Sequence, residues 1–303
     1  MARRYGVVMI IILLSAGMCA VQGNIGISEA ANFPTAHNNY ARVKASKNPQ
    51  KLVLRSASVL VEDQQTGECL VRKHAETVLP IASITKLMTA MVVLDAKLNL
   101  QESLTIASED VDTIRHSRSR LPVGTRITRG DALLLALMAS ENRAAHALGR
   151  TYPGGLTAFV SAMNIKATSL GLTETRFDDP SGISSGNVSS ARDLARMVDA
   201  AYRYRLIREF TTRKEATIHL GRRTREFRNS NRLIRSPRWQ IGLSKTGFID
   251  EAGRCLVMQA HVANRPVLIV LLDSQGKLTR YGDANRIRKW MEGPFAERHK
   301  HRG

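Results

Sequence analysis

Strand-forming segments lie near both ends of the chain, and a long helical block separates them. Residues 56–61 and 68–73 flank a glycine-containing turn, which predicts an antiparallel pair. Three further apolar or alternating runs, separated by turn residues, occupy 240–246, 255–263 and 266–273. A sheet that contains both groups must be assembled from the two ends of the chain, with the helical block inserted between them.

Capping patterns and turn residues mark the expected helices. Asp131 can cap one helix, and Ser190-Ala-Arg-Asp193 has the form of a capping box at the start of another. Helices are predicted at about 83–97 and 132–138, from Arg143 onward, from Ser190 onward and at about 283–291.

The first residues have the pattern of a secretion signal. Arg3 and Arg4 precede an unbroken apolar run over Val7–Leu14, and a cleavage site is expected after Val21-Gln-Gly23. The run is far shorter than the roughly 18–20 residues that a spanning helix needs. We therefore expect residues 1–23 to be removed on export, and the mature chain to associate at most peripherally with a membrane.

Beyond this segment we expect one large domain. Residues 24–50 are polar and mixed, as in a flexible lead-in, and residues 296–303 form a basic tail. A single domain is predicted over 51–295, with a helical lobe at about 100–235. The chain has 303 residues and is 43% hydrophobic, which is enough to bury a substantial core.

Ser83 and Lys86 form a Ser-x-x-Lys pair at the expected start of a helix. A serine hydroxyl becomes a good nucleophile when a base removes its proton, and a lysine can be that base when burial or a neighbouring cation destabilises its ammonium. A spacing of three places both side chains on one helix face, and a helix N-terminus directs N–H groups toward an oxyanion. The pair alone is weak support, because Ser274 and Lys277 match the same pattern.

Ser140 and Asn142, in Ser140-Glu-Asn142, lie between two predicted helices. A hydroxyl and an amide at such a place can relay a proton to a leaving group and hold a substrate backbone. This pattern also has chance matches, at Ser46-Lys-Asn48 and Ser185-Gly-Asn187. Its meaning therefore depends on the other motifs.

Lys245-Thr246-Gly247 occurs once, at the end of a predicted strand. Lys245 would supply a fixed positive charge, Thr246 a hydroxyl for a terminal carboxylate, and Gly247 the room for a substrate along the strand edge. The order Ser-x-x-Lys, Ser-x-Asn, Lys-Thr-Gly, on a helix start, an interhelical loop and a strand, is the arrangement of penicillin-binding proteins and class A β-lactamases.

From about Ala57 to Trp290 the chain resembles the low-molecular-mass penicillin-binding proteins, which are serine D-alanyl-D-alanine peptidases. The runs Ala82–Ala90, Leu133–Arg143 and Leu243–Phe248 look most like the D-alanyl-D-alanine endopeptidases of the penicillin-binding protein seven kind. The resemblance implies a β-lactamase/transpeptidase-like fold. This is a mixed α/β architecture of the α+β type, with a five-stranded antiparallel sheet, flanking helices and an inserted all-helical lobe.

The resemblance also implies the catalytic roles. Ser83 would attack the carbonyl of a penultimate D-alanine, with Lys86 as the general base. Ser140 and Lys245 would assist proton transfer to the leaving amine. Water would then release the acyl-enzyme, and neither a cofactor nor a metal ion is implied.

Further residues would bind the substrate. Asn142 would orient it beside the catalytic groups, Thr246 would bind the carboxylate of the departing residue, and Gly247 would leave room for it. The backbone N–H groups of Ser83 and Phe248 would form the oxyanion hole.

The expected activity is therefore hydrolysis of D-alanyl cross-links in peptidoglycan by a penicillin-sensitive endopeptidase in the periplasm. Two alternatives stay open: a carboxypeptidase that trims stem pentapeptides, and a penicillin-binding sensor without turnover. About a dozen residues follow Trp290, where most carboxypeptidase relatives carry a second domain and an anchor, and this favours the endopeptidase. No Glu-x-x-Leu-Asn segment lies between Asn142 and Lys245, so β-lactams should trap Ser83 as covalent inhibitors. We expect a monomer.

The resemblance places Cys69 on the second strand and Cys255 on the fourth, with two strands of the sheet between them. At roughly 4.8 Å for each strand step, their separation would be about 14 Å. A disulfide needs Cα atoms within roughly 7 Å. We therefore predict two free thiols.

The formal net charge is +19, and twelve basic residues face three acidic ones between Arg203 and Arg238. One hypothesis is an electropositive surface near the cleft that attracts the anionic wall polymer. An ordinary solvated surface is the alternative, and it stays open. An exported chain without a recognition motif is not expected to bind nucleic acid.

Overall fold

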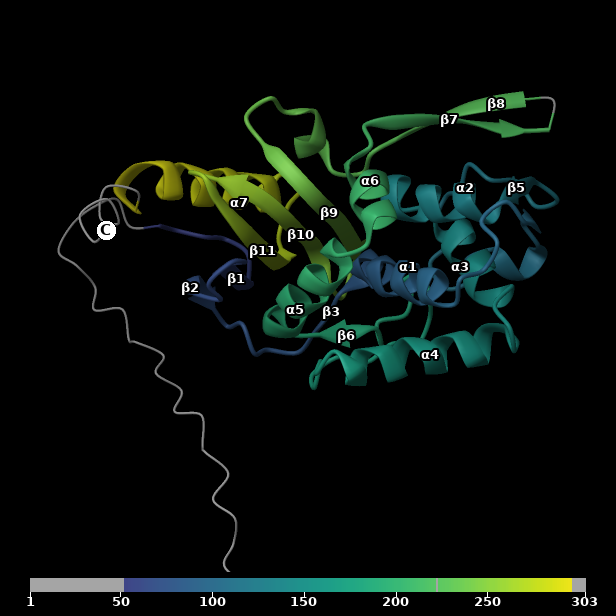
Figure 1. Ribbon diagram of the computed structural model, residues 1–303, viewed down its shortest axis with the longest axis horizontal. Helices are drawn as coiled ribbons and strands as arrows, with labels where there is room; N and C mark the ends of the chain where they lie inside the picture. Colours follow the sequence, from purple (N-terminus) through teal and green to yellow (C-terminus); the bar gives the residue numbers. More distant parts are fainter. Residues whose placement is uncertain (1–51, 222, 296–303) are drawn as a thin grey trace, which may run out of the picture. The chain divides into compact units, whose positions relative to one another are not determined.

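The computed structural model describes residues 52–221 and 223–295, so the predicted signal peptide, lead-in and basic tail lie outside the described residues. Within them, five strands form one antiparallel sheet in the order β2-β1-β11-β10-β9 (Figure 1). The strands are β1 (Ser58–Asp63), β2 (Cys69–Lys73), β9 (Gln240–Ile249), β10 (Gly253–Val262) and β11 (Arg265–Ser274). Because Ser58 of β1 lies opposite Leu272 of β11, the predicted assembly of the sheet from both ends of the chain is confirmed.

The sheet is buried on both faces. In β10, Cys255 and Val257 point into one hydrophobic core, whereas Leu256 and Met258 point into another. This separation follows from the two-residue period of a strand. Both faces therefore need a cover of helices.

Helix α7 (Thr279–Trp290) covers one face, with Tyr281, Ala284 and Ile287 buried against the sheet. It begins four residues before the predicted start at 283. The reason is that Asp283 does not cap the helix: it is buried one turn inside it and accepts a 2.7 Å hydrogen bond from the Ser56 backbone N–H. Helix α5 (Ala191–Tyr202) packs on the other face.

Between β2 and β9 the chain forms the lobe and its connections. Its helices are α1 (Lys86–Asp95), α2 (Arg129–Leu134), α3 (Asn142–Arg150), α4 (Gly155–Ser169), α5 and α6 (Arg205–Thr212). Short 3-10 or π turns are η1 (Ala82–Thr85), η2 (Ser108–Asp110), η3 (Leu135–Ala139) and η4 (Arg232–Arg235), and the turn η5 (Met291–Phe295) follows α7.

The resemblance implied an all-helical lobe, but the lobe also contains short strands. Two-stranded sheets join β3 (Leu79–Pro80) to β6 (Val188–Ser189), β4 (Ser103–Thr105) to β5 (Arg126–Thr128), and β7 (Glu215–Leu220) to β8 (Arg223–Arg228). In β7, Ala216 and Ile218 are buried while their neighbours are exposed, which is the period of a strand and not of a helix.

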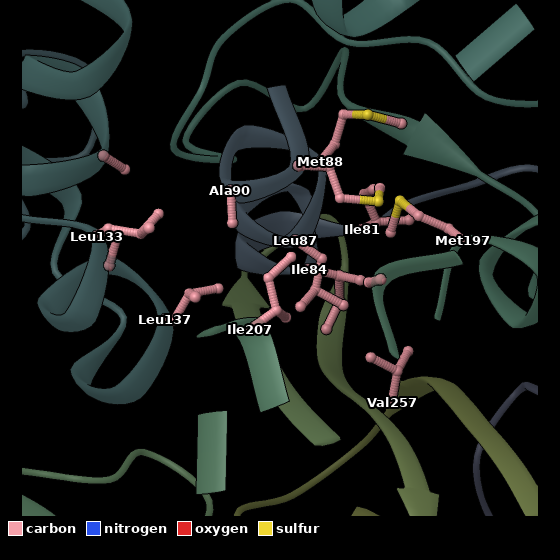
Figure 2. Packing of buried hydrophobic residues seen from close by; sticks show 14 of the residues in the cluster. Ile81, Ile84, Leu87, Met88, Ala90, Leu133, Leu137, Met197, Ile207 and Val257 are labelled. Carbon is pink, nitrogen blue, oxygen red and sulfur yellow. The ribbon is translucent and has the colours of Figure 1, made fainter. Parts of the chain in front are cut away.

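Helix α1 is the central element of the larger core (Figure 2). Its residues Leu87 and Met88 are fully buried. Around them lie Leu133 and Leu137 from the lobe and Val257 from the sheet. The helix that carries Lys86 is therefore fixed by both parts of the domain.

Local helix starts differ from the sequence predictions in two further places. Ser83 precedes α1 in the 3-10 turn η1, and the helix itself begins at Lys86. Helix α2 is capped by the Thr128 hydroxyl, which accepts a 2.9 Å hydrogen bond from the Asp131 N–H, so Asp131 lies in the first turn and is not the cap. The cap predicted at Ser190 is confirmed.

Among the described residues, no helix combines the length and the apolarity that a membrane span requires.

Cys69 and Cys255 are both free, as predicted, and β1 and β11 lie between their strands. Cys69 is partly exposed and Cys255 fully buried, and burial raises the pKa of the Cys255 thiol to about 11. Alkylation in denaturant should label both thiols with or without prior reduction, and alkylation of the folded protein should label Cys69 first. Labelling in denaturant that requires prior reduction would contradict the assignment.

Candidate active site

Ser83 lies in the turn η1, where its neighbours are buried and it is partly exposed. Fully buried Ile81 and Ile84 anchor the turn in the core. Strand β9 passes so close that a Cβ at Gly247 would lie 2.8 Å from the Ile81 carbonyl oxygen and 3.2 Å from the Ser83 nitrogen. Gly247 therefore lets the sheet edge reach the serine.

Lys86 is fully buried directly beside Ser83. Its Nζ lies 2.8 Å from the Ser83 Oγ, 2.7 Å from the Asn142 Oδ1 and 2.5 Å from the Ser181 carbonyl oxygen. Burial lowers the pKa of this amine to about 7, although the nearby carboxylates of Asp179 and other residues oppose the shift. A large neutral fraction near pH 7 is what a general base needs.

The loop over 179–187 supplies the Ser181 carbonyl. The Asp179 carboxylate accepts hydrogen bonds from the N–H groups of Ser181, Gly182 and Ser184, at 2.6, 2.8 and 2.8 Å. At Gly182 the φ angle is +78°, and a Cβ there would lie 2.1 Å from the Ala82 carbonyl oxygen. No sequence motif indicated that this segment contacts the nucleophile.

Ser140 lies between η3 and α3 in the left-handed region, with φ of +61° and ψ of +35°. This conformation places its Oγ 2.8 Å from the Lys245 Nζ, which is also 2.9 Å from the Thr246 carbonyl oxygen. Burial lowers the pKa of Lys245 well below its usual range, and the cations of Lys86 and Arg280 lower it further. These surroundings oppose the fixed positive charge expected for Lys245.

Lys245, Thr246 and Gly247 lie within β9, which continues to Ile249, and not at its end as predicted. The strand is longer because these residues pair with β10 as far as Gly253. The Thr246 hydroxyl donates to the Ser230 Oγ at 2.8 Å. Arg280 of α7 donates to the Gly247 carbonyl oxygen at 2.8 Å. No sequence motif pointed to Ser230 or Arg280.

Asn142 is the first residue of α3, and its Nδ2 donates to the Ser117 Oγ at 2.9 Å. A pocket of about 230 Å³ opens beside these groups. Its lining includes Ser83, Asn142 and Phe248, together with Asp112, Arg115 and Ser117 from one loop. Sequence reasoning missed that loop, because only the folded chain brings it to the serine.

The structure thus brings together all the residues that the three motifs predicted, and among the described residues it places the chance matches outside this group. Ser274 is buried at the end of β11, with β10 between it and β9, and its Oγ lies 2.7 Å from the Ser56 Oγ, whereas Lys277 is exposed. Asn187 holds the Asp179 loop with a 2.7 Å hydrogen bond from its Nδ2. Ser46-Lys-Asn48 lies outside the described residues.

A family model described as D-alanyl-D-alanine carboxypeptidase matches residues 43–276. The chain therefore belongs to the D-alanyl-D-alanine carboxypeptidase family of peptidases, which confirms the resemblance. It is 50% identical to a D-alanyl-D-alanine endopeptidase of Pseudomonas aeruginosa, over 80% of this chain and 79% of that protein. It is 44% identical to a D-alanyl-D-alanine endopeptidase of Escherichia coli, over 86% of this chain and 84% of that protein.

Solved structures show the same fold. The Streptomyces K15 DD-transpeptidase matches with a TM-score of 0.74 and 30% identity, over 81% of this chain and 98% of that one. A D-alanyl-D-alanine carboxypeptidase of Mycobacterium tuberculosis matches with a TM-score of 0.72 and 26% identity, over 81% and 94%. The mixed architecture with a five-stranded antiparallel sheet is confirmed.

Proposed function

We propose that this chain is a serine D-alanyl-D-alanine endopeptidase that hydrolyses D-alanyl cross-links in peptidoglycan through an acyl-enzyme on Ser83. The observation that carries the proposal is the buried Lys86 amine, 2.8 Å from the Ser83 Oγ, with its pKa lowered to about 7. The two relatives named as endopeptidases, at 50% and 44% identity, support the choice of cross-links as the substrate.

Acylation begins when neutral Lys86 takes the proton of the Ser83 hydroxyl, which frees the oxygen to attack the carbonyl of the D-alanyl residue. The backbone N–H groups of Ser83 and Phe248 receive the oxyanion, and each such donor typically lowers the barrier by roughly 3–4 kcal/mol. The Ser140 hydroxyl, linked to Lys245, passes a proton to the leaving amine as the peptide bond breaks. Water then attacks the ester, and its proton passes to the Ser140–Lys245 pair, which gave one to the amine. The departing Ser83 oxygen takes its proton back from the Lys86 ammonium as the second product leaves.

The substrate chain lies along β9, which is an edge strand of the described sheet. An extended peptide can add to such an edge through backbone hydrogen bonds. The carboxylate of the departing residue binds at the Thr246 hydroxyl and the Lys245 amine, and Asn142 orients the acyl side. An opposite charge beside Lys245 raises its pKa, so a bound carboxylate favours the ammonium form that burial and the neighbouring cations oppose.

A carboxypeptidase would use the same chemistry, with free D-alanine as the departing residue, and the family description favours this second candidate. Purified protein should cleave cross-linked muropeptide dimers faster than it trims pentapeptide monomers, with products followed by mass spectrometry. Trimming of monomers alone would identify a carboxypeptidase, and labelling by fluorescent penicillin without any product would identify a sensor. The Ser83→Ala control should lose both cleavage and labelling.

The location and partners belong to the same proposal. Residues 1–23 direct export to the periplasm and are removed, and the mature enzyme acts there as a monomer. Stem peptides and cross-links are its substrates. β-Lactams are covalent inhibitors that remain on Ser83, because the chain has no Glu-x-x-Leu-Asn segment to position a deacylating water.

A further inference from the structure

The hairpin of β7 and β8 projects from the lobe and is fixed to it by buried side chains and hydrogen bonds. Ala216, Ile218 and Phe227 are buried at 5% exposure or less. At its base, the Asn229 Nδ2 donates to the carbonyl oxygens of Thr211 and Arg213, at 2.9 and 2.7 Å. Figure 1 shows the two strands leading away from the large sheet, on the same side of the lobe as β5 and α2.

Two arginines on this hairpin have no acidic partner in the part of the chain that the structure describes. Arg223 and Arg225 are exposed, lie two residues apart and so share one face of β8, and form no ion pair with any residue that the structure describes. By contrast, Arg228 lies 2.6 Å from the Glu226 carboxylate. Because an unpaired exposed guanidinium keeps its full positive charge toward solvent, these two side chains can bind an anion.

Two more exposed arginines lie on the loop that lines the catalytic pocket. Arg120 donates from Nη1 to the Glu226 carbonyl oxygen at 3.1 Å, which joins the loop to β8. Arg118 and Arg120 are exposed, and Ser117, one residue earlier, lines the pocket beside Ser83. We call Arg118, Arg120, Arg223 and Arg225 the basic strip, which runs from the edge of the pocket to the hairpin.

The strip is better suited to a carboxylate-bearing polymer than to a lipid surface. A hairpin that inserts into a bilayer presents apolar side chains to it, whereas the apolar residues Ala216, Ile218 and Phe227 are buried here. Six residues of β8 extend over roughly 20 Å. The strip is therefore long enough to contact a polymer strand well outside the pocket. The pocket itself has a volume of only about 230 Å³.

We propose that the basic strip is a second binding site, which holds an anionic peptidoglycan strand through its free carboxylates beside the catalytic cleft. The proposal rests on the proposed function for the identity of the polymer. It assigns the hairpin a role in engaging intact wall and none in the bond cleavage itself. Arg223 and Arg225 lie on the hairpin and not in the lining of the pocket, so cleavage of a soluble dimer in the pocket does not need them.

The test compares the variant Arg223→Ser/Arg225→Ser with the matched control Lys277→Ser/Lys289→Ser, which removes two exposed charges outside the strip and outside the lining of the pocket. Binding to purified sacculi is measured by cosedimentation, and acylation by fluorescent penicillin and cleavage of soluble dimers are measured in parallel. In low salt the strip variant should bind sacculi roughly threefold or more weakly, because exposed charge pairs are individually modest. The difference should vanish in 1 M salt, where the Debye length is about 3 Å.

Acylation and dimer cleavage should stay unchanged in both variants, and the control should bind sacculi like the wild type. Equal sacculus binding by the strip variant in low salt, or an equal loss in the control, would overturn the proposal. The proposal would also be overturned if the strip variant lost binding to vesicles of phosphatidylglycerol and phosphatidylcholine but bound sacculi like the wild type. If the wild type cleaves no dimer yet the strip variant still loses sacculus binding, the proposed activity fails while the second site stands.

Discussion

Replacing Lys86 with methionine is expected to slow the acylation of Ser83 by penicillin by ~10²–10⁴-fold, the usual contribution of a positioned base. Methionine fills a similar volume but cannot accept the proton of the hydroxyl, which lies 2.8 Å from the Lys86 amine. The rate is measured by stopped-flow fluorescence with a labelled penicillin. Lys97→Met, at an exposed residue just after the same helix, is the matched control and should acylate normally.

The wild-type rate should also depend on pH in a defined direction. Burial lowers the pKa of Lys86 to about 7, and the neutral amine that acts as the base dominates above that pKa. Acylation should therefore rise about tenfold for each pH unit below 7 and level off above it. A flat profile between pH 5.5 and 8, or a Lys86→Met variant that acylates within tenfold of the wild type, would contradict the assignment of the base.

Gly182→Ala should damage both the fold and the nucleophile. The new Cβ would lie 2.1 Å from the Ala82 carbonyl oxygen and 2.9 Å from the Ser83 nitrogen, so the Asp179 loop or the serine turn must move. Overpacking typically costs about 1–3 kcal/mol, and a displacement of 1 Å at a reacting group can cost ~10²-fold in rate. We expect losses of this size in the free energy of unfolding in urea and in the acylation rate.

Gly171→Ala is the control that separates the effect of the close contact at Gly182 from the effect of backbone strain. Gly171 also has a positive φ, of +66°, but a Cβ there would meet no atom within 4 Å. It should cost only the roughly 1–2 kcal/mol of a left-handed alanine and leave acylation unchanged. If the two variants acylate equally well, the close approach of Gly182 to the serine turn does not position the nucleophile.

The sequence located the reactive residues because their motifs are short and their spacing reflects local geometry. Ser83 and Lys86 are three residues apart, and a turn followed by a helix brings them together whatever the rest of the fold does. Lys245 was recognised by its neighbours Thr246 and Gly247. The strands of the antiparallel sheet could also be predicted from the sequence, because they show either alternation or continuous apolar runs.

What the sequence did not reveal depends on contacts between distant segments. The Ser181 carbonyl reaches Lys86 across 95 residues, and Arg280 reaches Gly247 across 33. A backbone carbonyl has no residue type that would identify it, and an arginine on a terminal helix resembles any surface cation until it is seen to be buried. The low pKa of Lys245 has the same origin, because its cause is burial between a helical turn and the sheet.

The pairing of β1 with β11 has a consequence for how the enzyme is made. Ser58 meets Leu272, so a chain emerging from the ribosome cannot close its sheet until nearly all of it has been synthesised. Such long-range pairing makes folding slow. The serine and its lysine are made early, but Lys245 and the edge strand that would hold a peptide are made late, and the strands β10 and β11 that support this edge follow them. A partly made chain thus carries the nucleophile without a substrate groove, and reactivity appears only when the whole domain is complete.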